Sequence, residues 1–356
     1  MRVLQLSANT SAAYAGLLLR EWGFDVDHID VAQAFPHIDE TRQAAQSVFM
    51  ATTIEGAGCA VEPHDIDLRN YDAIIEDVGT DLLSQLALDW HALHKTVPQI
   101  HLVSISAFGM TGPASGWQAT DLIIQAAGGV LHVSGHEDEA PRKLPGETAA
   151  MIAGVHGATA VLAAFYGQQT ASDKGTNAIA DSDKRNLPEG VHIDISAQDT
   201  LMHHWCRHVA DYAYSGTLTE RQSRDPSGIH TRHTARANDG WVFLLALGQP
   251  WQDVAAFLGL GEFLTPDVMT PAAEQPWEAM CDAYDAAVAS RSRYEWFADA
   301  ADLGWTFAPV EDPWSVANGP QTNARKSMHD RHFDGKQIKV PGLPARIWSD
   351  IRSGSN

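Results

Sequence analysis

The sequence predicts an α/β fold built on a doubly wound parallel sheet. Short apolar runs alternate with helical patterns along the first half of the chain, which is typical of parallel strands joined by helices. The first strand–helix–strand unit takes about 30 residues, the length that a parallel crossover needs. The 356 residues are 44% hydrophobic, so the chain can bury a large core rather than remain disordered.

The N-terminal half supplies the predicted strands in order. Val3–Leu6 is a short apolar strand, and a helix follows from Ala12 to Trp22 with Gly23 at its stop position. Further strands and one amphipathic helix are predicted at Val26–Ile29, Ala73–Glu76, Leu82–His94 (the helix) and Ile100–Ile105. The first strand is not followed by a GxGxxG turn, which disfavours a nicotinamide enzyme.

The remainder of the chain begins with helices and then changes in composition around Asp225–Gly228. Predicted elements before this change are helix Asp121–Val130, the small-residue helix Ala149–Tyr166, an exposed loop at Thr170–Glu189, strand Val191–Ser196 and helix Ala197–Tyr214. After it come strand Gly240–Leu247, helices Trp251–Leu258 and Trp277–Ser290, a turn and strand within Ala301–Val310, and a proline-punctuated connector at Val340–Pro344. The second block therefore predicts a smaller domain.

Charge and cysteine content exclude several classes of protein. With 24 Lys+Arg against 45 Asp+Glu the formal net charge is −21, which repels phosphate backbones and disfavours nucleic-acid binding. Cys59, Cys206 and Cys281 lie far apart in the sequence, which argues against a disulfide framework and a CxxC metal site. We expect reduced thiols in a cytoplasmic protein. The absence of a signal-peptide pattern and of a long uninterrupted apolar run predicts no membrane association.

Candidate metal and acid residues are few. His203, His204, Cys206 and His208 share one predicted helix, and His230 and His233 accompany Arg232 and Arg236 in a turn. Neither group supplies a full ligand set, so no metal site is predicted. No GxSxG elbow is present. Glu147 precedes the small-residue helix, where it serves either as a carboxylate nucleophile or as an acid favoured by the helix dipole.

Several segments, in order along nearly the whole chain, resemble the class III CoA-transferases. Pro98–Pro113 is similar to the family's P-x-L-V-x-x-S-x-S-x-F-G-x-x-G-P segment, and Asp121–Gly129 to D-x-x-x-Q-A-x-G-G. Gly154–Phe165 and Val191–Ser196 resemble the long helix and the V-D-V-S strand that follow. The family includes formyl-CoA and carnitine CoA-transferases and α-methylacyl-CoA racemases.

The resemblance implies a Rossmann-like large domain at residues 1–220, a small α+β domain at 228–315, and a segment at 316–356 that returns to the large domain. It also implies an interlocked dimer. Coenzyme A or acyl-CoA would be a substrate rather than a tightly bound cofactor. By position it would meet Asn9, Thr10 and Ser11 in the opening turn, Asp77 and Val78 after the strand at Ala73–Glu76, and Phe108 and Gly109 after the strand at Ile100–Ile105.

The chain departs from the family pattern at working positions. The nucleophilic Asp of the transferases falls at Ala150, and Glu147 lies three residues earlier. The basic His of the racemases falls at Thr120. Cations that face the phosphates of coenzyme A in the family are nearly absent: before Pro141 the basic residues are Arg2, Arg20, Arg42, Arg69 and Lys95. Arg142, Lys143 or a partner chain would have to compensate.

Three functions follow from the resemblance. The chain either transfers CoA between carboxylic acids with Glu147 or an unrecognised acid as nucleophile, or is a non-catalytic subunit whose intact paralogue supplies the Asp. The third alternative is an acyl-CoA racemase, isomerase or lyase, with His132, His136 and His156 as candidate bases. The expected partners are an acyl-CoA, a small carboxylic acid and a second chain, identical or paralogous.

Overall fold

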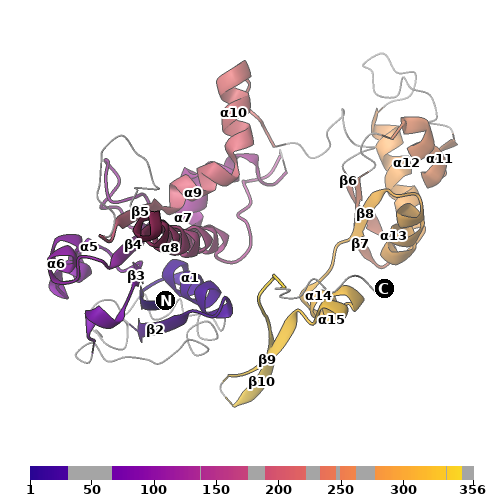
Figure 1. The fold of residues 1–356 in the computed structure, drawn as a ribbon. Coiled ribbons are helices and arrows are strands. Elements are labelled where there is room, and N and C mark those ends of the chain that lie inside the picture. Colours follow the sequence, from indigo (N-terminus) through magenta and orange to yellow (C-terminus); the bar gives the residue numbers. More distant parts are fainter. Residues whose placement is uncertain are drawn as a thin grey trace. The chain divides into compact units, whose positions relative to one another are not determined.

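The structure is a computed structural model of the chain (Figure 1). It describes residues 1–30, 66–136, 138–174, 189–221, 233–245, 249–261, 277–333 and 335–346. The chain divides into two compact units: Met1–Arg221 with Lys326–Asn356, and Gln222–Arg325. Each unit has its own core.

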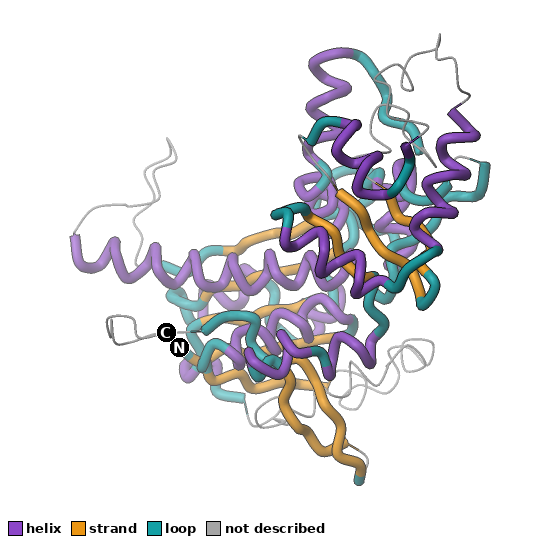
Figure 2. The backbone as a smooth tube through the Cα atoms, turned by 90° about the vertical axis from the view of Figure 1, so that its right-hand side faces the viewer, coloured by secondary structure: helices purple, strands orange, loops and turns teal. Residues whose placement is uncertain are grey.

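The first unit contains a five-stranded parallel sheet in the order β2-β1-β3-β4-β5. Its strands are β1 (Arg2–Ser7), β2 (Asp25–Asp30), β3 (Ala73–Glu76), β4 (His101–Ser106) and β5 (His192–Ser196). The central strands are apolar on both faces because helices cover both faces. Figure 2 shows the strands running side by side with a long helix lying along them. The parallel α/β fold predicted from the sequence is confirmed.

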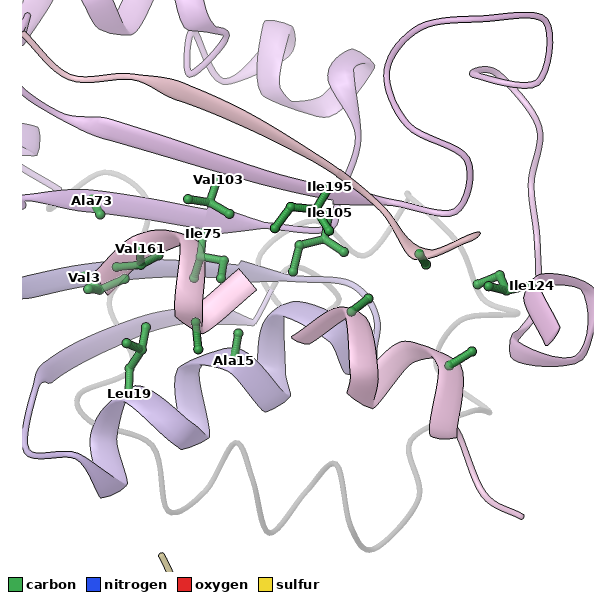
Figure 3. Close-up of a cluster of buried hydrophobic side chains, with 14 of the residues drawn as sticks. Val3, Ala15, Leu19, Ala73, Ile75, Val103, Ile105, Ile124, Val161 and Ile195 are labelled. Carbon is green, nitrogen blue, oxygen red and sulfur yellow. The ribbon is translucent and has the colours of Figure 1, made fainter. Parts of the chain in front are cut away.

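Two helices cover one face of the sheet: α1 (Thr10–Glu21) and α8 (Thr148–Lys174). Val3, Ile75 and Val103 project from the strands toward Ala15 and Leu19 of α1 and toward Val161 of α8 (Figure 3). Alternate strand residues, such as Leu4, Ile74 and Leu102, point to the opposite face, where they pack against α5 (Thr80–Gln85) and α6 (Trp90–Thr96). Side-chain alternation along each strand thus fills two cores.

Glycines set the close approach of α8 to its neighbours. A Cβ at Gly154 would lie 2.6 Å from the carbonyl oxygen of Ser11, and one at Gly157 would lie 2.7 Å from Ile105 Cδ1. By length and composition the stretch Thr148–Thr170 could also cross a membrane, but 44% of its most apolar window is buried in the protein. α8 packs against the sheet, as a core helix does.

Two predicted helices are each divided into two, and a third is shortened. The single helix expected at Leu82–His94 is two helices, because Ala87 adopts a positive φ of 55° and Asp89 caps α6. The helix expected at Ala197–Tyr214 is likewise divided at Trp205 into α9 (Ala197–His204) and α10 (Cys206–Ser215). α7 (Asp121–Ala127) ends earlier than expected and is followed by the 3-10 turn η3 (Val130–Val133).

The loop expected at Thr170–Glu189 is only partly described. Its first residues continue α8 to Lys174, so the prediction of a loop is wrong for them. Residues 175–188 of that segment lie outside the described residues.

The second unit is a small α/β body with an antiparallel sheet, β6-β7-β8. The strands are β6 (His233–Ala237), β7 (Gly240–Leu245) and β8 (Thr306–Pro309), and helices α11 (Trp251–Leu258), α12 (Trp277–Ala289) and α13 (Arg293–Asp302) accompany them. Val242, Val254, Met280 and Phe307 meet in its core. The short helices α14 (Pro313–Asn318) and α15 (Pro320–Arg325) end the unit.

An antiparallel pair, β9 (Met328–Phe333) and β10 (Lys336–Pro341), returns to the first unit. Arg331 forms an ion pair with Glu21 of α1 at 2.6 Å. Val340 and Pro341, expected to begin a connector, instead complete β10.

Replacing Gly154 by Ala should destabilise the first unit. Ala favours a helix over Gly by up to about 1 kcal/mol, yet the new methyl group meets the Ser11 carbonyl, and overpacking costs about 1–3 kcal/mol. We expect the free energy of unfolding, measured by urea denaturation, to fall by about 1–2 kcal/mol. Gly116→Ala is the control, since a Cβ there meets no atom within 4 Å. A Gly154→Ala variant as stable as the parent would contradict this packing.

Candidate functional site

Most of the residues predicted to bind coenzyme A lie at the carboxyl edge of the parallel sheet. β1, β3 and β4 end at Ser7, Glu76 and Ser106, and the predicted residues follow within a few positions. The chain leaves β1 for β2 on one side and returns to β3 on the other. Ligands of open α/β sheets bind at such a switch in strand order, so this edge is the candidate site.

Asp77 joins the end of β3 to the start of α1. Its carboxylate accepts hydrogen bonds from the backbone amides of Ala8 (2.7 Å), Asn9 (3.0 Å) and Ala12 (2.9 Å). The Asn9 side-chain amide donates to the Asp77 carbonyl at 3.2 Å. Burial raises the pKa of Asp77 to about 7, and nearby Glu76 adds to this rise. The hydrogen bonds from the three amides lower the pKa and offset part of the effect. A carboxylate therefore occupies two amides of the turn before α1 and one amide in its first turn, a position where a ligand phosphate would otherwise bind.

Glu76 is a second buried acid at the same edge. Its carboxylate accepts hydrogen bonds from the amides of Val78 (2.8 Å) and Gly79 (3.0 Å). Burial raises its pKa, while the Ser104 side chain and these amides oppose the rise. Val78 is itself buried, so it supports the turn after β3 rather than presenting a side chain to a ligand.

Glu147 stands directly before α8 and reaches α1. Its carboxylate accepts a hydrogen bond from the Thr10 hydroxyl. Thr10 and Ser11 are both buried, and the Ser11 carbonyl faces Gly154. The structure thus brings together Asn9, Thr10, Ser11, Asp77 and Glu147 of the predicted site residues.

Ala150 lies in the first turn of α8, beside Asp121, an acid that is not among the site residues predicted from the sequence. The Ala150 amide donates to Asp121 Oδ1 at 3.0 Å, and Gln125 Nε2 donates to Asp121 Oδ2 at 2.6 Å. The signal for this acid was present, because Asp121 and Gln125 are spaced i, i+4 at the start of a predicted helix. Its contact with Ala150 depends on the packing of two helices.

Phe108 and Gly109 lie at the same edge but farther along the sheet. Phe108 makes an edge contact with Trp117 at 6.2 Å, and Gly109 has a φ of 85°. The amide of Met110 donates to Asp194 Oδ2 at 2.9 Å, which ties this loop to β5. Among the described residues no hydrogen bond or ring contact joins Phe108 or Gly109 to Glu147.

One candidate base, His156, lies beside two other histidines. The ring of His156, on α8, lies 5.9 Å from that of His203 and 5.7 Å from that of His204. Burial lowers the pKa of His156, as do His204 and His203. In the described part of the chain no group of three or more His, Cys, Asp or Glu side chains is arranged to hold a metal ion. His230 and Arg232 lie outside the described residues.

Two basic residues are engaged by carboxylates. Arg2 lies at the amino end of β1, at the opposite edge of the sheet, and pairs with Asp27 at 2.7 Å. Arg142 pairs with Glu139. Lys143 Nζ donates to the carbonyl of Gly146 at 2.8 Å, one residue before Glu147, and no carboxylate of the described residues pairs with it. Lys143 is therefore the cation best placed to meet an anionic ligand at the start of α8.

Asp77 should make stability depend on pH. Its pKa is about 7 in the folded chain against 3.8 unperturbed, so between these values the folded state keeps a proton that the unfolded state has lost. The free energy of unfolding therefore falls as pH rises from about 4 to 7, by on the order of 4 kcal/mol from this group.

Asp77→Asn removes that titration. We expect the difference in unfolding free energy between parent and variant to shrink from pH 5 to pH 8, measured by urea denaturation. Asp89→Asn at the start of α6 controls for the loss of a capping carboxylate. A difference that does not change with pH would show that Asp77 is ionised throughout.

Curated proteins similar to this chain are CoA-transferases. The succinate–glutarate CoA-transferase of Agrobacterium fabrum is 24% identical over 286 residues, covering 73% of this chain and 66% of that protein. The succinyl-CoA:mesaconate CoA-transferase of Haloarcula hispanica is 20% identical over 385 residues, covering 99% of this chain and 90% of that protein.

Solved structures show the same fold. A CaiB/BaiF family protein from Brucella suis superposes with a TM-score of 0.74 at 20% identity, covering 98% of this chain and 92% of that one. A protein from Mycobacterium tuberculosis, Rv3272, gives a TM-score of 0.70 at 17% identity with the same coverage. The sequence pattern of CoA-transferase family III matches residues 68–352. This chain belongs to CoA-transferase family III.

Proposed function

We propose that this protein transfers coenzyme A from an acyl-CoA thioester to a carboxylic acid. Family membership supports this class of reaction. The observation that carries it is the meeting of acids at the carboxyl edge of the sheet, where α1, α7 and α8 begin. Glu147 contacts α1, and Asp121 contacts Ala150 of α8. A carboxylate that attacks the thioester carbonyl forms a mixed anhydride and releases the thiolate of coenzyme A.

A non-catalytic subunit is the second candidate, and Ala150 favours it. The methyl group of Ala150 has no nucleophilic atom, so the chain would then complete a dimer with a paralogue that carries the acid. The racemase alternative receives less support. His156 contacts His203 and His204 rather than the acids at the start of α8.

A dimer is part of the proposal. Large apolar side chains are exposed on the adjoining helices α7 to α10: Leu122, Ile123, Val155, Tyr166, Met202, Val209, Tyr212 and Tyr214. Exposed large apolar side chains on neighbouring helices are typical of a protein interface. We assign it to a second copy of the chain, or to a paralogue, in the cytoplasm.

The transferase proposal predicts turnover by the purified chain. Succinyl-CoA and formyl-CoA would be offered with glutarate, oxalate or mesaconate, the acids that the names of the relatives suggest. We expect a new CoA thioester by chromatography and mass spectrometry, and Ala150→Asp should raise the rate by at least about tenfold by supplying a second acid. Turnover only after mixing with an intact homologue would support the subunit alternative instead.

The exposed helices predict how the dimer would be broken. Val209→Asp and Tyr212→Asp place charges on α10 and should shift the chain from dimer to monomer in analytical ultracentrifugation. Lys95→Asp on α6, on the other face of the sheet, is the control. A parent protein that sediments as a monomer at micromolar concentration would rule out the homodimer.

A further inference from the structure

The start of α8 has a carboxylate beside it although position 150 is Ala. Asp121 begins α7, yet its Oδ1 accepts the backbone amide of Ala150 at 3.0 Å. Among the described residues, Asp121 is the acid whose side chain is hydrogen-bonded to Ala150. The resemblance places the family's nucleophile at this same residue of α8.

Asp121 is held in one orientation. Gln125 Nε2 donates to Oδ2 at 2.6 Å, and Gln125 Oε1 accepts the amide of Leu144 at 2.8 Å. Gln125 is fully buried, whereas Asp121 is only half-buried and its neighbour Leu122 is exposed. A carboxylate oxygen has two lone pairs, so each Asp121 oxygen keeps one after accepting one hydrogen bond. The group is therefore both oriented and open to a substrate.

Glu147 is placed differently. Its carboxylate is engaged by Thr10 of α1, and Glu147 precedes the helix rather than lying beside position 150. Asp121 has a further advantage, because the amide it accepts belongs to the N-terminal turn of a long helix, where the dipole stabilises negative charge. The same amide would stabilise an oxyanion that forms at the Asp121 carboxyl carbon.

We propose that Asp121 is the catalytic carboxylate that accepts the acyl group in this chain, an assignment that rests on the proposed transferase function. A carboxylate oxygen of Asp121 attacks the thioester carbonyl carbon, the C–S bond breaks, and coenzyme A leaves as the thiolate. The product is a mixed anhydride. The thiolate then attacks the Asp121 carbonyl carbon, which releases the donor carboxylate and leaves a thioester on Asp121.

The acceptor completes the cycle by reversing these two steps. Its carboxylate attacks the Asp121 thioester and expels the thiolate, which gives a second mixed anhydride. The thiolate attacks the acceptor's acyl carbon, forms the product thioester and frees the Asp121 carboxylate. No net proton or electron is transferred, so the cycle needs no further reactant.

Trapping tests the assignment directly. The purified chain is incubated with succinyl-CoA and hydroxylamine, which converts an acylated carboxylate into a hydroxamate, and peptides are mapped by mass spectrometry. We expect the hydroxamate on Asp121. Asp121→Asn keeps an oxygen acceptor for the Ala150 amide and should lower turnover at least about 100-fold, whereas the matched variant Asp89→Asn, at the capping aspartate of α6, should stay within about threefold of the parent.

The outcomes separate this inference from the transferase proposal. A hydroxamate on Glu147, or turnover retained by a folded Asp121→Asn variant, overturns the role of Asp121 and leaves the transferase in place. Turnover without any trapped carboxylate does the same. A parent chain with no turnover and no adduct on any acyl-CoA of the panel overturns the proposed function and this assignment with it. If Asp121→Asn does not fold, the position of the hydroxamate in the parent decides.

Discussion

The buried carboxylate of Asp77 is the contact on which the candidate site depends. It holds the turn before α1 and the first turn of α1 against the end of β3, at the point where the strand order reverses. That tie fixes Thr10, and Thr10 in turn holds Glu147 at the start of α8. Because the carboxylate satisfies amides that a phosphate would otherwise use, the site gains rigidity and loses an anion-binding position. Under the proposed function, the phosphates of coenzyme A would have to meet other groups, such as Lys143 close to the start of α8.

Local sequence patterns predicted the strands well, because a strand's apolar character is visible in a few adjacent residues. The strand at Ala73–Glu76 and the helix at Trp251–Leu258 were predicted with their observed bounds. The interruptions of the predicted helices at Ala87 and Trp205 were not predicted, because neither residue type usually ends a helix. Tertiary packing overrides local propensity at both positions. The predicted site residues lie at one edge of the sheet because they follow the carboxyl ends of parallel strands, and the family resemblance identified them.

The contacts that define the chemistry could not be read from spacing. Thr10 and Glu147 are 137 positions apart, and Ala150 and Asp121 are 29 apart on different helices. A sequence pattern reports which face of a helix a residue occupies, but it does not report which residue of another helix faces it. Asp121 was visible as the first acid of a helix with Gln125 one turn later. Its relevance emerged only when the helix α8 was placed beside it.

Two glycines of α8, Gly154 and Gly157, bear on how this chain could have diverged. To bring Glu147 into the place of Ala150, the sequence of α8 would have to shift by three positions. Met151 would then occupy the place of Gly154, where a Cβ atom would lie 2.6 Å from the Ser11 carbonyl oxygen. The same shift would put Gly154 in the position of Gly157 but would leave no room for the methionine. An insertion or deletion before the helix would therefore not place Glu147 at position 150 without a steric clash. A lineage that has lost the acid at this position can regain one only by a point substitution there or by recruiting a neighbour from another helix.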